Sequence, residues 1–380
     1  MGEIKKRMLF FFHENPFSNR AGNVTRCKKN IEIFNELGYD IDLVGSYDVY
    51  VGMNDNLIIN SPLINQHFLI KRKPKDENFI NRIKYKILKK IKKSSNYFAT
   101  PYFLSKFHKI IKENNYDIIF INYEIWSELT NFKELENTKK IVDTHDWMTL
   151  NEYYKNQKLD IGKRFSQELQ NLDKFDHVIT ISNDENFVFS SFLGNKVFNI
   201  PPYFDQNFIE IDVNKKYDII FVGSDNPFNI KAINWFLDKV LPLLPSSSKI
   251  CVIGRVSKYI SEIKNVEKNI FVEDLSTFYQ ASKIAICPML EGTGIKIKVI
   301  EALSYALPVV GTIKAVDGFG EKRHNGCFVS DDPEEFAKNC LELINNQELY
   351  SRATSEAKDF FINNFSKEIN YELWKKLLVN

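Results

Sequence analysis

Apolar strand-like runs alternate with helical patterns along almost the whole chain. In the first half these runs are RMLFFFH (7–13), IDLVG (41–45), DIIFIN (117–122), KIVDTH (140–145) and HVITIS (177–182). In the second half they are YDIIFVGS (217–224), KICVIG (249–254), the short NIFVEDL (269–275), KIAICP (283–288) and PVVGT (308–312). Strands separated by helices are typical of parallel sheets with helices on both faces. The pattern predicts an α/β fold with doubly wound sheets.

A linker is predicted where the alternation pauses, at NIPPYFDQNF (199–208), because two prolines exclude a central strand there. At 380 residues the chain has the length of about two domains. We expect an N-terminal domain over 1–200 and a C-terminal domain over 204–366, facing a central cleft. The last helix, in 367–380, has no strand after it and is expected to pack back on the N-terminal domain.

Composition narrows the class of protein. Hydrophobic residues make up 44% of the chain and charged residues 26%, as in globular proteins. The five cysteines are scattered without a C-x-x-C pair, so neither a zinc site nor a disulfide framework is expected, and a reducing cytoplasm fits best. The apolar run at residues 8–12 is too short for a signal-peptide core, and no stretch approaches the roughly 20 apolar residues of a membrane span.

The net charge of +2 conceals a basic segment at residues 71–93. This segment holds eleven Lys or Arg against Asp76 and Glu77, so it carries +9 and the rest of the chain −7. Its helical projection has an apolar face and a basic face. The apolar face consists of Phe79, Ile80, Ile83, Ile87, Leu88 and Ile91, and the basic face of Arg82, Lys86, Lys89 and Lys93.

Such a cationic amphipathic helix suits contact with an anionic membrane surface. The alternative is that its apolar face packs on the N-terminal domain while its lysines are solvated. Binding of nucleic acid is not expected, because no aromatic platform or recognition module accompanies the charge.

The segment EGTGIKIKVIEALSYALPVVGT (291–312) has the composition of a phosphate and sugar site. It follows the strand-like KIAICP, and ligands of open α/β sheets bind beyond the carboxyl ends of strands. Gly292 and Gly294 permit close backbone approach, and Thr293 can cap a helix. Lys296 and Lys298 add positive charge, and Glu301, two turns into the predicted helix, can accept hydrogen bonds from a sugar diol. The alternative is an ordinary strand–loop–helix.

Several common motifs are excluded. The segment is not G-x-G-x-x-G, because Ile297 occupies the third glycine position, and no Walker A sequence occurs. Asp40 and Asp42 form a D-x-D, but within GYDIDLVG they indicate a turn entering a strand rather than a metal site. His13-Glu14 lacks a second histidine, and there is no G-x-S-x-G.

EGTGIKIKVIEALSYALPVV (291–310) resembles the donor-binding signature of family 4 glycosyltransferases (glycosyl transferases group 1), which have the two-domain GT-B fold. Most of the chain shares the likeness. FVGSDNPFNIKAINWFL (221–237) resembles the opening of the family's second domain, and IFVEDLSTFYQASKIAICP (270–288) the segment before the signature. ENPFSNRAGNVTRCKKNIEIFNELGYDIDLVG (14–45) resembles its N-terminal glycine loop, helix and second strand, and VITISNDE (178–185) another strand end.

The resemblance implies two Rossmann-like domains and transfer of a sugar from a nucleotide-sugar, held mainly by the second domain, to an acceptor held by the first. It implies retention of anomeric configuration, no metal and no other cofactor. Glu301 would hold the ribose diol, and the basic candidates for the diphosphate are Lys231, Arg255 and Lys298. The remaining donor-binding candidates are Gly22, Asn23, Ser224, Leu275, Gly292, Thr293, Gly294 and Ile295.

His145 and Asp146, in VDTHDW at a strand end, are candidates for orienting the acceptor or assisting proton movement. The alternative is that they cap a loop and a helix. Glu291 is the candidate for the first member of the family's acidic pair. Its spacing to Glu301 departs from the family pattern, so Thr293 competes for that position.

Two further departures are notable. Ser224 replaces a frequent arginine. Ala306 replaces a common helix-end glycine. If the backbone there is left-handed, the alanine costs about 1 kcal/mol. We expect instead that the turn differs.

We therefore predict a GT-B glycosyltransferase that acts on a glycan, a lipid-linked acceptor or a protein in surface glycan assembly. The expected location is the cytoplasm, with a peripheral contact at the inner face of the membrane through residues 71–93. The alternatives are a non-catalytic GT-B partner subunit and a nucleotide-sugar epimerase. The donor's base and sugar, the acceptor and the oligomeric state are not encoded in any recognisable motif.

Overall fold

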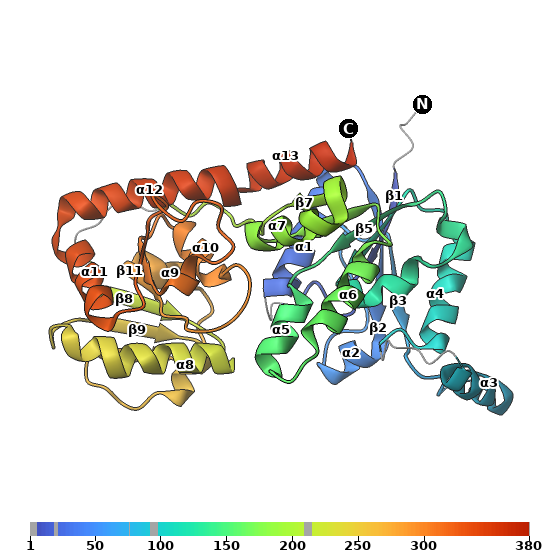
Figure 1. The fold of residues 1–380 in the computed structure, drawn as a ribbon, viewed down its shortest axis with the longest axis horizontal. Coiled ribbons are helices and arrows are strands. Elements are labelled where there is room, and N and C mark those ends of the chain that lie inside the picture. Colours follow the sequence, from blue (N-terminus) through green and yellow to red (C-terminus); the bar gives the residue numbers. More distant parts are fainter. Residues whose placement is uncertain (1–5, 19–21, 76, 92–97, 209–214, 380) are drawn as a thin grey trace. The chain divides into compact units, whose positions relative to one another are not determined.

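The computed structural model describes residues 6–18, 22–75, 77–91, 98–208 and 215–379 (Figure 1). The chain divides into two compact units. The first comprises Met1–Ile181, Glu185–Ile200 and Leu378–Asn380, and the second Ser182–Asp184 and Pro201–Leu377. Each unit has its own parallel sheet and its own core, as the alternating sequence pattern predicts.

The first unit contains a seven-stranded sheet of order β3-β2-β1-β4-β5-β6-β7, in which every pair of neighbours is parallel. Its strands are β1 (Arg7–Phe11), β2 (Asp40–Ser46), β3 (Gln66–Ile70), β4 (Ile118–Asn122), β5 (Lys139–Asp143), β6 (His177–Thr180) and β7 (Val197–Asn199). The helices in this part of the chain are α1 (Gly22–Glu36), α2 (Tyr47–Gly52), α3 (Phe79–Ile91), α4 (Pro101–Glu113), α5 (Met148–Lys155), α6 (Ile161–Leu172) and α7 (Asn183–Leu193).

Aromatic side chains fill the core of this unit on both faces of the sheet. On one face Phe10 of β1 stacks on Phe120 of β4, with ring centroids 5.1 Å apart. On the other, Phe11 meets Trp126 at 4.8 Å. Consecutive strand residues point to opposite faces, so these unbroken apolar runs mark strands covered on both sides.

The second unit contains a six-stranded sheet of order β10-β9-β8-β11-β12-β13, again parallel throughout. Its strands are β8 (Tyr217–Val222), β9 (Ile250–Ile253), β10 (Val266–Asn269), β11 (Ser282–Cys287), β12 (Val309–Gly311) and β13 (Cys327–Val329). Its helices are α8 (Pro227–Trp235), α9 (Ser276–Gln280), α10 (Ile297–Leu303), α11 (Pro333–Asn345), α12 (Gln347–Phe365) and α13 (Lys367–Leu378).

In both sheets the chain starts in the middle, runs to one edge and then returns to build the other side. The direction changes between β1 and β4 in the first unit and between β8 and β11 in the second. Such switch points, at the carboxyl ends of the strands, are where doubly wound sheets bind ligands. The loops after these four strands are therefore the candidate ligand-binding regions.

Several edge elements differ from the sequence prediction. The strands β3, β7 and β13 were not predicted, because they are three to five residues long and mostly only half-buried. NIFVEDL was predicted as a strand, but β10 ends at Asn269, and the Ile270 and Phe271 that follow are 50% and 80% exposed. Apolar residues therefore mark a strand reliably only where a helix or another strand covers them.

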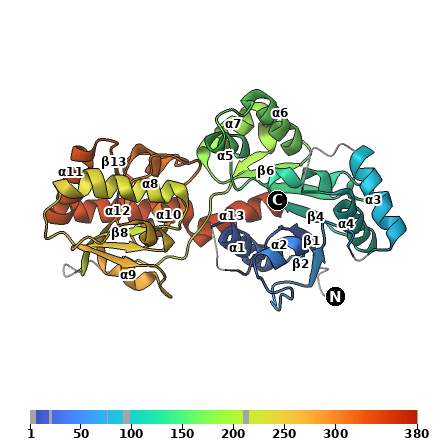
Figure 2. The same cartoon turned by 90° about the horizontal axis from the view of Figure 1, so that it is seen from below.

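Helix α3 lies at the edge of the first unit beside α4 (Figures 1 and 2). The alternative that its apolar face packs on the domain is wrong for most of the described side chains, because Phe79 and Ile80 are each 75% exposed and Ile87 is 51% exposed. Leu88 is half-buried. Asp76, Lys92 and Lys93, and the side chains of Lys89 and Ile91, lie outside the described residues. None of the described helices is long and apolar enough to cross a membrane.

Candidate functional site

The loop between β11 and α10 contains the predicted phosphate site. Gly292 and Gly294 both have positive φ, 110° and 66°, which glycine adopts without strain. The buried Lys296 amine donates hydrogen bonds to the carbonyls of Thr293 at 3.3 Å and Gly294 at 2.7 Å, so the loop folds around it. Lys296 therefore has a structural partner within the loop itself.

The helix begins later than predicted. Its first residue is Ile297, its N-cap is Lys296, and no side-chain hydrogen bond caps it. The proposed capping role of Thr293 is therefore wrong. The left-handed backbone at Gly292 and Gly294 is incompatible with a right-handed helix, so the helix can begin only after these two residues.

Glu301 lies in α10 with its carboxylate half-buried. The phenol of Tyr279, from α9, donates to Glu301 Oε2 at 3.0 Å. Burial raises the pKa of Glu301, while the hydrogen bond from Tyr279 and the charge of Lys298 oppose that shift. A carboxylate with one oxygen held in this way has its other oxygen in position to accept hydrogen bonds from a ligand.

Lys298, also in α10, points back toward the end of β8. Its amine donates to Asn229 Oδ1 at 2.5 Å and lies 4.7 Å from the ring centroid of Phe221. Burial lowers the pKa of Lys298 to about 8. Asn229 in turn donates to the carbonyl oxygen of Ser224 at 3.1 Å and to its hydroxyl at 3.2 Å. The side-chain amide of Asn229 thus links the residues that follow β8 to helix α10, which follows β11.

The remaining charged candidates form two exposed pairs. The Lys231 amine, on α8, contacts the Glu291 carboxylate. Arg255, at the end of β9, forms a 3.0 Å ion pair with Asp225. All four side chains are at least 40% exposed, so these pairs contribute little to stability, and an incoming anion can recruit both cations. Of the other candidates, Leu275 is the N-cap of α9 and Ile295 is buried in the loop.

The glycine at the end of β9 allows two loops to approach closely. Gly254 has φ of 102°, and a β-carbon there would lie 2.1 Å from the carbonyl oxygen of Gly223. Only a glycine fits, and this contact brings the residues after β8 and β9, Ser224 and Arg255, to the same edge of the sheet.

The helix end after α10 is left-handed, contrary to our expectation of a different turn. Ala306 has φ of 55°, the conformation in which a glycine is usual. Its amide still donates to Leu303, and Leu307 donates to Ala302, which closes the helix and leads into β12. The chain thus adopts the usual helix end at the cost of a strained alanine.

In the first unit, His145 follows β5. It lies at the carboxyl edge of the sheet, the edge that contains the switch point between β1 and β4. Both His145 and Tyr123, which follows β4, have positive φ, 60° and 70°, and their rings stack with centroids 4.6 Å apart. His145 Nε2 lies 2.7 Å from Asn122 Oδ1, which fixes Nε2 as the donor. Burial lowers the pKa of His145 to about 4, so the imidazole is neutral at physiological pH.

Helix α1 is tied to the same edge. Arg26 Nε donates to the buried Asp143 Oδ2 at 2.7 Å, and Asn30 donates to the same oxygen at 3.1 Å. In the first turn of this helix, which contains Gly22, the Asn23 amide donates to Glu14 Oε1 at 3.2 Å and to the Tyr123 phenol at 3.1 Å. Asn23 therefore belongs to a polar group shared by the loops after β1 and β4.

Glu168 of α6 caps the neighbouring helix α5 from outside. Its carboxylate accepts from the backbone amides of Met148 and Thr149, both at 2.9 Å, and contacts the Thr149 hydroxyl. The N-cap residue, Trp147, makes no side-chain cap of its own. Burial, with repulsion from Glu124, raises the pKa of Glu168 to about 7. The half-buried Asp146 lies just before this helix.

Sequence reasoning identified residues on both switch-point edges but missed their partners. Tyr279, Asn229, Asn122 and Arg26 act through contacts over 22 to 117 residues of sequence, which leave no local pattern. A local signal exists at Asn226-Pro227, because an asparagine cap followed by a first-turn proline marks the start of α8, the helix that carries Asn229.

No group of three or more metal-ligating side chains converges in the part of the chain that the structure describes. Asp42, from the D-x-D, accepts from Arg7 at 2.6 Å and from Tyr116 and Asn65, each at 2.8 Å. These contacts agree with its interpretation as a structural residue at a strand start.

Comparisons with known proteins show similarity in sequence and in fold. Residues 216–346 match the family model for glycosyl transferases group 1. A curated relative, an uncharacterized 44.6 kDa protein in the cps region of Klebsiella pneumoniae, is 22% identical, with 92% of each chain covered. The poly(ribitol-phosphate) alpha-N-acetylglucosaminyltransferase of Staphylococcus aureus is 24% identical, covering 98% of this chain and 73% of the relative.

Solved structures show the GT-B architecture over the full length. Sucrose-phosphate synthase from Thermosynechococcus elongatus has a TM-score of 0.72 at 15% identity and covers 99% of this chain and 100% of its own. HepE of Anabaena, solved with UDP and glucose, has a TM-score of 0.69 at 14% identity over 99% of this chain and 100% of its own. TarM has a TM-score of 0.71 at 14% identity over 98% of each chain.

Proposed function

Since residues 216–346 carry a glycosyl transferases group 1 domain within a GT-B fold, we propose that the protein transfers a sugar from a nucleotide-sugar to a glycan or lipid-linked acceptor. The observation that carries the proposal is the pairing of Glu301 with Tyr279 beside the buried amine of Lys298. A fixed carboxylate next to a cation suits a ligand that joins a diol to a diphosphate. We propose UDP as the nucleotide, because related structures were solved with UDP.

In this proposal the second unit holds the donor. Glu301 accepts from the ribose hydroxyls, and the loop at Gly292–Gly294 offers backbone amides to the phosphates or the sugar. Lys298 contributes the charge that the departing diphosphate needs, with Lys231 and Arg255 released from their surface pairs. Stabilising the charge that develops on the leaving group is the main catalytic contribution expected of such a site.

The first unit binds the acceptor in this proposal, and the transfer retains the anomeric configuration. The neutral His145 orients rather than titrates, because its low pKa and its bond to Asn122 hold the ring in one protonation state. The candidate carboxylates are the half-buried Asp146, between β5 and α5, and the more exposed Glu291, between β11 and α10. In a retaining transfer the departing phosphate can take the acceptor's proton, so the protein mainly positions the reactants.

We further propose that the protein acts at the cytoplasmic face of a membrane, on an acceptor anchored there. The exposed apolar face of α3 and the +9 charge of residues 71–93 support this contact. The five free thiols support a reducing compartment. The test is flotation with vesicles containing anionic lipid. Wild-type protein that stays in solution at low salt would overturn the membrane contact.

The donor proposal is tested by thermal shift against UDP, GDP, dTDP, ADP and CMP, with Glu301→Ala as the control. A nucleotide at a hundred times its Kd stabilises the protein by about 2.7 kcal/mol. We expect UDP to raise the Tm of the wild type and not of Glu301→Ala. If no nucleotide does so, a non-catalytic partner subunit replaces the enzyme as the best reading, and hydrolysis of a nucleotide-sugar without acceptor would restore the enzyme.

A further inference from the structure

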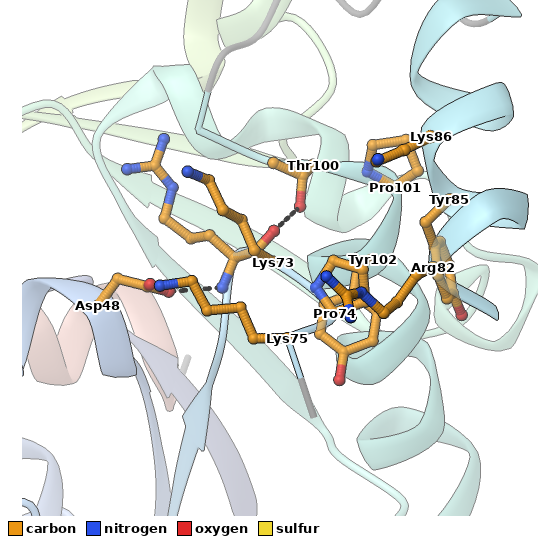
Figure 3. A pocket seen from close by; sticks show the side chains of 11 residues that line it. Asp48, Lys73, Pro74, Lys75, Arg82, Tyr85, Lys86, Thr100, Pro101 and Tyr102 are labelled. Carbon is orange, nitrogen blue, oxygen red and sulfur yellow. Dashed lines mark hydrogen bonds between the residues drawn. The ribbon is translucent and has the colours of Figure 1, made fainter. Parts of the chain in front are cut away.

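A cavity of about 560 Å³ opens in the first unit between the segment after β3, helix α3 and the start of α4 (Figure 3). One part of its wall is apolar or aromatic, with Pro74, Tyr85, Pro101 and Tyr102. The rest, apart from Thr100, is charged, and five cations face a single carboxylate: Arg72, Lys73, Lys75, Arg82 and Lys86 against Asp48. The cavity thus combines an aromatic wall with a strong positive charge.

Its frame is held by contacts that leave most of this charge unneutralised. The Arg72 amide donates to Asp48 Oδ2 at 2.6 Å, and the Thr100 hydroxyl donates to the Arg72 carbonyl at 2.7 Å. The nearby Glu77 is occupied by Lys106 at 2.7 Å. Within the described ranges, the side chains of Lys73, Lys75, Arg82 and Lys86 form no ion pair, so an anion entering the cavity meets four unpaired cations and one carboxylate, Asp48.

Helix α3 supplies both a wall of the cavity and an exposed apolar stripe. Tyr85 fixes its orientation, because its hydroxyl donates to Ser105 Oγ at 2.9 Å and its ring meets Tyr102 edge-on at 5.0 Å. Arg82 and Lys86 then face the cavity, as Figure 3 shows. Their sequence neighbours Ile83 and Ile87 are 41% and 51% exposed.

We propose that this cavity binds the phosphate headgroup of an anionic membrane lipid, with the apolar stripe of α3 among the acyl chains. The inference rests on the membrane contact proposed above and assigns it a specific site. A water-soluble phosphate would leave the stripe without a partner, whereas an amphipathic anion satisfies the stripe and the cations together. A phosphomonoester is favoured over a phosphodiester, because its second charge and third terminal oxygen engage more of the five cations.

The experiment measures binding of the full chain to vesicles of phosphatidylcholine that contain either phosphatidic acid, a phosphomonoester, or phosphatidylglycerol, a phosphodiester, adjusted to equal zeta potential. One double variant, Arg82→Ala with Lys86→Ala, removes two cations from the cavity. The matched control, Lys84→Ala with Lys90→Ala, removes two exposed cations of the same helix that do not line it. Both variants lose two charges from α3.

We expect the wild type to bind phosphatidic acid about tenfold more tightly than phosphatidylglycerol. Both variants weaken binding to phosphatidylglycerol, by about fivefold per lost charge. Only the cavity variant loses the preference, to within twofold. If both variants keep the preference or both lose it, the cavity proposal is wrong while the membrane contact stands. If the wild type binds neither vesicle, both proposals fall, and the nucleotide assay decides the transferase function independently.

Discussion

The phenol of Tyr279 donates a 3.0 Å hydrogen bond to Glu301 Oε2, and its ring stacks on Tyr305 with centroids 4.8 Å apart. The hydrogen bond and the ring stack together hold the Glu301 carboxylate in a fixed position. This arrangement separates the role of the carboxylate from the role of the group that orients it, and the two can be tested apart.

Replacing Tyr279 by Phe should keep the stack and remove the bond to Glu301. We expect nucleotide affinity to fall about tenfold, the usual weight of a hydrogen bond to a charged group. Isothermal titration with UDP measures the change. Tyr305→Phe is the control, because it retains the stack and, in the described structure, the Tyr305 hydroxyl forms no hydrogen bond with Glu301. Equal affinities for Tyr279→Phe, Glu301→Gln and the wild type would remove Glu301 from the donor site.

Nucleotide affinity should depend on pH through Lys298. Burial lowers the pKa of its amine to about 8, and a bound diphosphate would raise it. Affinity should therefore be constant between pH 7 and 7.5 and fall by up to tenfold per pH unit above about 8. The Kd measured from pH 7 to 9.5 tests this expectation. Lys298→Arg stays charged over this range, so its nucleotide affinity should not change with pH. If the affinity of this variant still falls above pH 8, another group causes the pH dependence.

The pKa of Glu168, raised to about 7 by burial, predicts a pH-dependent stability. In the unfolded chain this carboxyl titrates near its ordinary value of about 4.3. The folded state thus binds more protons between these values, and the contribution is full below the lower pKa and is lost as pH rises toward 7. Glu168→Gln has no charge to bury. Its Tm relative to the wild type should therefore rise from pH 5 to pH 8, and a constant difference would contradict the assignment.

The glycines at 254 and 38 form a matched pair for testing the close approach of β8 and β9. Both have positive φ, 102° and 87°, but an added β-carbon clashes with the Gly223 carbonyl only at Gly254 and meets nothing within 4 Å at Gly38. Gly38→Ala should cost about 1–2 kcal/mol, the strain of left-handed backbone alone. Gly254→Ala should cost several kcal/mol more in urea unfolding. Similar losses would show that the loops can separate at little cost.

The central strands could be predicted from the sequence because their apolar runs are buried on both faces. β1, β4 and β8 lie within the predicted runs, and β11 begins one residue before its run, at Ser282. The edge strands could not, because three residues such as those of β13 carry too little pattern, and pairing with a neighbour defines them. The start of α10 was predicted wrongly for a different reason. Glycines that are compatible with a helix N-terminus are equally compatible with a loop, and here the loop makes the helix begin later.

The residues of the candidate site likewise fall into those that the sequence predicts and those that only the fold brings together. Glu301 and the glycine loop are adjacent in sequence to a strand and a helix, so motif and spacing suffice to find them. The bridge from Lys298 through Asn229 to Ser224 joins residues 69 and 5 positions apart across two strands. Only the packing of β8 beside β11 brings these side chains together.

The left-handed backbone at Tyr123 and His145 has a consequence for engineering. Each residue carries roughly 1 kcal/mol of backbone strain that a glycine would not, but glycine at either position would give up a packed ring worth several kcal/mol. The same change removes one ring of the stacked pair and the anchor for Asn23 or Asn122. Thermal tolerance and the order of this sheet edge are therefore coupled at these two positions, and selection for heat resistance should retain Tyr123 and His145 despite their strain.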